Sequence, residues 1–131
     1  MPTRVTLKLV LGNRAVLMRE LTVLTLDVFR AERMGLAQLI PHAAMVQTKR
    51  LLQRAPCRLT GTQKVELEQV LVHSTRLNTM HVARQALEKL WERSPATQEE
   101  LLAVLQTWCV DAERSGPRPL QRFARQLASY G

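Results

Sequence analysis

The sequence predicts an all-α fold, a single-domain bundle of about six helices in which the first helix is long. Apolar residues recur at the three- and four-residue spacing of helix faces along most of the chain. Only five aromatic residues and five glycines occur, which disfavours a strand-rich fold. With 131 residues, 46% hydrophobic and 23% charged, the chain has enough apolar material for one domain with its own core.

The first helix is predicted over residues 3–40, a stretch that contains no proline. Its inward seam repeats at a spacing of four and three residues and consists of Leu17, Leu21, Leu24, Val28 and Ala31, widened by Met18, Phe29, Leu36 and Ile40. Gly12-Asn13 and Gly35 are the points at which this helix is open to a break. The broad seam favours a spine of the bundle, and pairing with a second copy of the chain, as a homodimer, is the alternative. Residues 5–9 alternate like a strand, but one strand alone forms no sheet.

Five shorter helices are predicted to follow, over residues 42–54, 61–73, 76–93, 97–115 and 117–130. Proline and glycine separate them at Pro41, Ala55-Pro56, Ser94-Pro95 and Gly116-Pro117. Two helices begin with the pattern of a capping box, Thr60 with Gln63 and Thr97 with Glu100. The residues predicted to face inward are, in chain order, Met45, Val46, Leu51, Leu52, Val65, Leu67, Val70, Leu71, Leu77, Met80, Ala83, Leu87, Leu90, Trp91, Leu101, Leu105, Trp108, Cys109, Ala112, Leu120, Phe123, Ala124 and Leu127.

The net charge of +8 predicts an anionic partner: nucleic acid, an anionic membrane surface or an acidic protein. Residues 1–56 hold nine Lys/Arg and three Asp/Glu, a net charge of +6, and residues 57–131 hold ten and eight, a net charge of +2. The candidate residues for contacts with phosphate are Arg118, Arg122 and Arg125, spaced along one face of the last helix, and Lys49, Arg50 and Arg54. The alternative interpretation of both groups is an ordinary solvated surface.

Nothing in the sequence predicts catalysis, a metal or a cofactor. His42, His73 and His81 lack the spacing of metal ligands and are interpreted as partly exposed structural residues. Glu66/Glu68, Glu88/Glu92 and Glu99/Glu100 are interpreted as solvated helix charges, and Ser74, Ser94, Ser115 and Ser129 as capping residues. Gly-x-Ser-x-Gly and glycine-rich phosphate loops are absent from the sequence. The chain is therefore predicted not to be an enzyme.

The two cysteines and the N-terminal residues bear on the cellular location. Cys57 and Cys109 fit neither a zinc nor a disulfide pattern and are predicted to be buried thiols. Charged residues interrupt the N-terminal apolar run too early for a signal peptide, and no window reaches the roughly 18 apolar residues of a transmembrane helix. We expect a cytoplasmic protein.

The last third of the chain carries a family resemblance. The segments concerned are Leu90–Ser94, Leu102–Cys109, Ala112–Gly116 and Phe123–Tyr130, with weaker similarity at Leu11–Met18 and Leu67–Leu90. They resemble the helical C-terminal region of bacterial fatty acid desaturases, and a similar helical segment occurs near the C-terminus of some insertion-sequence DDE transposases. Thr107 and Pro117 depart from the pattern, where an acidic and an aliphatic residue are expected; both positions concern surface contacts.

The resemblance implies a helical module and transfers neither enzyme's activity. Desaturases work through a diiron centre held by histidine boxes, and the three histidines here lie in none of them. Transposases of this kind cut DNA with acidic residues on a ribonuclease H-like sheet, which the sequence does not predict. We therefore expect a non-catalytic binding or assembly module with a nucleic-acid or protein partner. The alternatives are a detached accessory tail of a membrane desaturase and a transposase remnant with residual DNA binding.

Overall fold

The computed structural model describes residues 14–92 and 98–128. Every regular element in these two ranges is helical, which confirms the all-α prediction. The elements are α2 (Arg14–Ala37), α3 (His42–Leu52), the 3-10 turn η1 (Pro56–Arg58), α4 (Gly61–Leu71), α5 (Thr75–Glu92), α6 (Gln98–Glu113) and α7 (Arg118–Ala128). The expectations for residues 3–13, including the strand-like alternation of residues 5–9, and for the cap at Thr97 lie outside the described residues.

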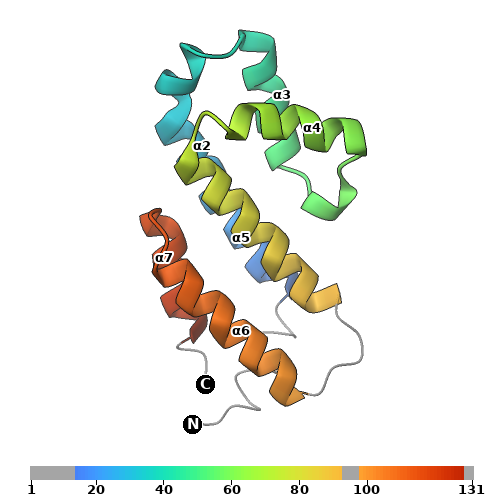
Figure 1. Cartoon of the computed structure of the whole chain (residues 1–131), viewed down its shortest axis with the longest axis vertical. Coiled ribbons are helices and arrows are strands. Elements are labelled where there is room, and N and C mark those ends of the chain that lie inside the picture. Colours follow the sequence, from blue (N-terminus) through green and yellow to red (C-terminus); the bar gives the residue numbers. More distant parts are fainter. Residues whose placement is uncertain (1–13, 93–97, 129–131) are drawn as a thin grey trace.

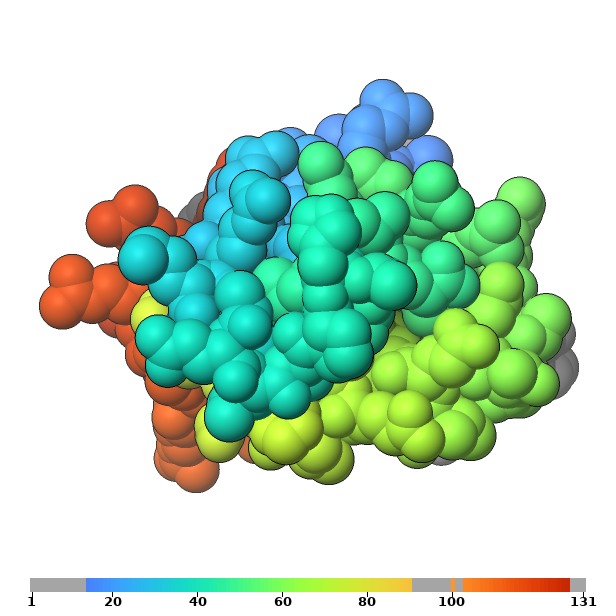
Figure 2. All heavy atoms as spheres, turned by 90° about the horizontal axis from the view of Figure 1, so that it is seen from above, coloured from blue at the N-terminus to red at the C-terminus, as the bar shows by residue number. Residues whose placement is uncertain are grey.

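The two longest helices, α2 and α5, pack side by side and form the centre of the molecule (Figure 1). The hairpin of α6 and α7 packs on them, with α6 against α5 and α7 against α2. The shorter helices α3 and α4 gather at one end of the long pair. Viewed from that end, α3 covers the middle of the molecule and α7 protrudes on the side away from α4 (Figure 2).

The long helix α2 is the spine, as predicted, because α3, α5 and α7 of the same chain all pack against it. Helices of the same chain therefore cover the seam, which removes the reason for pairing with a second copy. The helix continues through Gly35 and ends at Ala37, before the predicted residue 40. Its end is a tight turn in which Leu39 N and Ile40 N both donate to Leu36 O at 2.9 Å. The extended backbone of Pro41 then begins α3.

Side-chain caps fix where α4 and α5 begin. The predicted capping box of α4 is present: Gln63 N donates to Thr60 Oγ1 at 3.1 Å, and Thr60 N donates to Gln63 Oε1 at 3.0 Å. Ser74 Oγ accepts a hydrogen bond from Leu77 N at 3.2 Å, as expected of a capping serine. The same hydroxyl donates to Glu32 Oε1 at 2.9 Å. This bond ties the start of α5 to α2.

Most residues predicted to face inward are buried in one core. The buried ones are Leu17, Leu21, Val28, Phe29, Leu36, Met45, Leu51, Leu52, Leu67, Val70, Leu71, Leu77, Met80, Leu87, Leu90, Leu105, Trp108, Cys109, Ala112, Leu120, Phe123, Ala124 and Leu127. The side chains of Trp91 and Leu101 lie outside the described set. The core thus draws on every helix from α2 to α7.

Three residues predicted to face inward are exposed instead: Ala31, Val46 and Val65. Two threonines take places on the buried faces, because the hydroxyl of a threonine can be satisfied inside its own helix. Thr25 Oγ1 donates to Leu21 O, and Thr48 Oγ1 donates to Ala44 O, each at 2.7 Å. A prediction from hydrophobicity alone misplaces the face of a helix by one residue where such a threonine is buried.

Trp108 joins three helices at the centre of the C-terminal half. Its indole Nε1 donates to the backbone oxygen of Ala83 in α5 at 2.9 Å. Its ring meets the ring of Phe123 in α7 edge to face, with centroids 5.9 Å apart and an interplanar angle of 83°. The α6–α7 hairpin is therefore held to α5 by a polar contact as well as an apolar one.

Candidate nucleic-acid interface

The three predicted arginines of α7 lie on its solvent face. Arg118, Arg122 and Arg125 are exposed, and the opposite face buries Leu120, Phe123, Ala124 and Leu127. Helix α7 is the most strongly amphipathic of the described helices. Its packing on α6 and α2 therefore leaves the whole arginine face free for a partner.

Arg122 lies beside a groove of about 520 Å³ between α2 and α7. Arg19 of α2 lines the same groove, so two guanidinium groups from different helices meet there. Glu20 and Asp27 line it as well, and the two carboxylates balance the two arginines. This groove alone is therefore not a strongly cationic site.

The basic residues predicted in and after α3 are separated by the fold. Lys49 lines a small groove of about 290 Å³ against α2, together with Arg30, Arg33 and His42. Arg54 lines a larger hollow on another side of the α3 end. Arg50 is exposed and lines neither. The C-terminal end of α2 separates α3 from α7 in the view from above, so the two predicted groups do not form one cluster (Figure 2).

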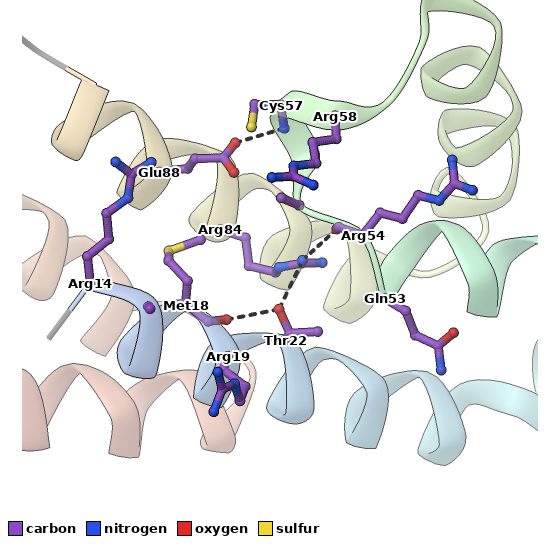
Figure 3. Close-up of a pocket in the computed structure, with 12 residues that line it drawn as sticks. Arg14, Met18, Arg19, Thr22, Gln53, Arg54, Cys57, Arg58, Arg84 and Glu88 are labelled. Carbon is purple, nitrogen blue, oxygen red and sulfur yellow. Dashed lines mark hydrogen bonds between the residues drawn. The ribbon is translucent and has the colours of Figure 1, made fainter.

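The larger hollow has a volume of about 850 Å³. It lies between the N-terminal half of α2, the turn from α3 into η1, and α5 (Figure 3). Five arginines line it with one carboxylate, and the full set is Arg14, Ala15, Met18, Arg19, Thr22, Gln53, Arg54, Ala55, Cys57, Arg58, Arg84 and Glu88. We call it the arginine hollow.

Arg84 forms the floor of the arginine hollow and is 1% exposed. Its Nη1 donates to Leu52 O at 3.0 Å, and its Nη2 donates to Arg54 O at 3.0 Å and to Thr22 Oγ1 at 3.1 Å. The guanidinium thus joins α5 to the end of α3 and to α2 (Figure 3). Burial lowers the pKa of Arg84 to about 10, opposed by the nearby Glu88 carboxylate. The group remains a cation at neutral pH.

Glu88 corrects one sequence interpretation, because it is buried rather than solvated, with 6% of its surface exposed. Its Oε1 accepts a hydrogen bond from Cys57 N at 2.9 Å, which holds η1 against α5. A buried cation requires a compensating charge, and Glu88 supplies it one helical turn from Arg84. Arg84 and Glu88 together pin the turn between α3 and η1.

His81 also differs from its predicted partial exposure. It is 5% exposed and lies one turn before Arg84 on the buried face of α5. Burial, followed by the positive charge of Arg84, lowers the pKa of His81 to about 4. The imidazole is therefore neutral at pH 7. Its Nδ1 has no hydrogen-bond partner among the described residues.

The cysteines behave differently from each other. Cys109 is buried as predicted, and burial, followed by the charge of Glu113, raises the pKa of its thiol to about 11. Cys57 is exposed, contrary to prediction, because the 3-10 turn places it at the edge of the arginine hollow. The short turn was not apparent from the sequence, which shows only Ala55-Pro56.

The remaining four arginines of the hollow, Arg14, Arg19, Arg54 and Arg58, are exposed at its rim. Within residues 14–92 and 98–128 the ion pair that forms is Arg30 with Asp27, at 3.3 Å, and none of the four rim guanidinium groups takes part in one. Glu88 is the one carboxylate of the lining, and its Oε1 accepts a hydrogen bond from Cys57 N. The lining as a whole therefore carries an excess of positive charge.

Sequence reasoning found one of the five arginines in the hollow, Arg54. Arg14 and Arg19 lie in α2 and Arg58 lies in η1, and only the fold brings the two elements together. Arg84 and Glu88 did leave a signal: they interrupt the inward face that runs through Met80 and Leu87, and they are four residues apart. Two charged residues of opposite sign on an apolar face indicate buried charges with structural partners.

Two further properties of the described residues bear on function. They contain no group of three or more His, Cys, Asp or Glu side chains placed to hold a metal ion. None of the described helices combines the length and the apolar character needed to cross a bilayer.

Fold and site together define an all-α basic domain with a cationic surface formed by several helices. Comparison with known families places it more closely: the sequence model of the ISL3 family of DDE transposases, described as a transposase, matches residues 19–131. The chain belongs to this transposase family. No curated protein and no solved structure matches it. The match supports the transposase part of the resemblance seen in the sequence, and nothing in the comparisons supports the desaturase part.

Proposed function

We propose that this transposase-family chain binds the phosphate backbone of DNA along a track of arginines that crosses three structural elements. The track runs from the exposed face of α7, across α2, to the turn after α3. The proposed role of the described residues is to bind DNA and not to cleave its strands. Family membership supports DNA as the polyanion, since transposases act on DNA.

One observation carries the proposal: Arg19 lines both the α2–α7 groove and the arginine hollow. It therefore connects Arg122 on α7 with the rim arginines Arg14 and Arg58. Guanidinium groups bind phosphates through paired hydrogen bonds, and successive phosphates along a strand need successive cations. A continuous row from several helices meets that need better than isolated surface charges do.

The lining of the hollow favours the backbone over the bases. None of its twelve lining residues is aromatic, so the hollow offers no ring on which a base could stack. Contacts of this kind give affinity with little sequence preference. We therefore expect duplexes of unrelated sequence to bind similarly.

Charge reversal tests the proposal. In fluorescence anisotropy at low salt, Arg118→Glu, Arg122→Glu and Arg125→Glu together should weaken binding to a labelled duplex by about 100-fold or more, because three phosphate contacts become repulsive. The matched control reverses Lys64, Arg76 and Lys89, three exposed cations on α4 and α5 that line none of the three hollows described above. Both variants have the same net charge. Equal weakening in the two would show that only net charge matters, and the track would be wrong.

A further inference from the structure

We propose that the arginine hollow is a discrete binding site for one phosphate group of the DNA backbone, which fixes the register of the strand on the protein. The inference rests on the proposed function and goes beyond it, because it assigns one phosphate to a formed site and not to a diffuse surface. The ligand chemistry is that of a phosphodiester or a terminal phosphate. It is held by guanidinium groups from α2 and from η1.

The floor of the site is preorganised. Arg84 is held by three hydrogen bonds to two backbone oxygens and one hydroxyl, and Glu88 accepts from Cys57 N. These contacts fix the turn that carries Arg54 and Arg58 relative to α2, which carries Arg14 and Arg19. The elements that carry the rim arginines are therefore held in fixed positions relative to each other before a ligand binds. Preorganisation of this kind reduces the entropy lost when a ligand binds.

The charges of the site call for an anion. Like charges that share one hollow repel each other, and the five guanidinium groups of the lining outnumber its one carboxylate, Glu88. In Figure 3, Arg14 from α2 and Arg58 from η1 extend toward Glu88 from opposite sides, whereas Arg54 points away from the hollow. Arg14 and Arg58 thus reach into the hollow from two different elements, and Arg19 lies on the side toward α7.

The size of the site fits a strand that passes through it. A volume of about 850 Å³ is much larger than one phosphate needs. The non-polar residues of the lining are Ala15, Met18 and Ala55. A hollow of this size with guanidinium groups on two sides accommodates a phosphate together with its flanking sugars. An acidic protein partner would need a projecting acidic segment that fits the hollow. Membership of a transposase family favours DNA as the partner.

Two titrations of the same variants test the inference, one with inorganic phosphate followed in ¹H–¹⁵N spectra and one with duplex DNA followed by anisotropy. In wild type, inorganic phosphate should give saturable shifts at the amides of residues 14–19 and 53–58. Arg14→Gln with Arg58→Gln should raise the Kd for phosphate by at least about tenfold, because two charged contacts are lost. The control is Arg118→Gln with Arg125→Gln, which removes two charges outside the hollow and should leave the Kd for phosphate unchanged.

The outcomes separate the two proposals. If both variants bind phosphate like wild type, or if the shifts spread over the whole surface, the hollow is not a site, although DNA binding by wild type would still support the arginine track. If wild type binds phosphate in the hollow and fails to bind DNA, the site is one for a free anion, and both the proposed function and this assignment are wrong. Arg14→Lys with Arg58→Lys keeps the charge and should recover part of the affinity. An unchanged urea midpoint in each variant shows that the fold is retained, since both residues are exposed.

Discussion

The buried guanidinium of Arg84 gives the sharpest prediction of stability. Replacing Arg84 with Met keeps most of the side-chain volume and removes the charge, so little cavity forms. The change leaves Leu52 O, Arg54 O and Thr22 Oγ1 without their donor. It also leaves Glu88, which is 6% exposed, without its cation. Leaving buried acceptors unpaired, together with a buried carboxylate that loses a nearby cation, costs about 3–5 kcal/mol, and we expect the free energy of unfolding to fall by that amount.

Urea unfolding followed by circular dichroism measures this loss. Arg76→Met is the matched control, since Arg76 lies on the same helix and is exposed; it should change stability by no more than about 0.5 kcal/mol. Arg84→Lys should fall between the two, because an ammonium keeps the charge but lacks the planar fork that reaches three acceptors. If Arg84→Met lies within about 1 kcal/mol of wild type, the guanidinium does not hold the turn as described.

Two further predictions concern α5 and its neighbours. The pKa of His81 is about 4 in the folded chain and 6.5 in the unfolded chain. Above pH 6.5 the imidazole is neutral in both states, and the folded state has its full stability. As the pH falls from 6.5 toward 4, the unfolded chain binds a proton first, so the free energy of unfolding decreases. Wild type should be about 2 kcal/mol less stable at pH 5 than at pH 7.5 in urea unfolding, and His81→Leu should lose most of that dependence; an equal dependence in both would contradict the assignment. Trp108→Phe should cost about 1–3 kcal/mol, because Ala83 O loses its donor, whereas Phe123→Ala should cost about 3–5 kcal/mol by leaving a cavity between α6 and α7. If Trp108→Phe is as stable as wild type in thermal unfolding, the indole hydrogen bond contributes little to stability.

The fold was largely predictable because its signals are local. Helix periodicity, the capping box at Thr60 and Gln63, and the break at Gly116-Pro117 depend on residues close in sequence. Val46 was misplaced because hydrophobicity alone ignores the hydroxyl bond that lets Thr48 be buried on the same helix. The 3-10 turn at Pro56–Arg58 is too short to leave a periodic pattern.

The candidate site was predictable only in part because it is assembled from distant segments. Arg118, Arg122 and Arg125 were found because they share one helix face, a local property. Arg14, Arg58 and Arg84 come together only after α2, η1 and α5 pack. The spacing of residues within any one segment does not predict that these three arginines lie close together. The interruption of the α5 face by Arg84 and Glu88 is the one trace that the sequence retained.

The dependence of DNA affinity on salt tests the central claim, that an arginine track contacts DNA phosphates, more directly than any other measurement. The logarithm of the binding constant should fall linearly with the logarithm of salt concentration, with a slope of about −0.9 for each phosphate contacted. Arg19→Gln, Arg122→Gln and Arg125→Gln together should therefore make the slope shallower by about 2 to 3. The control Lys64→Gln, Arg76→Gln and Lys89→Gln should keep the slope of wild type. A slope that stays the same in the first variant, or that changes equally in both, would contradict the account.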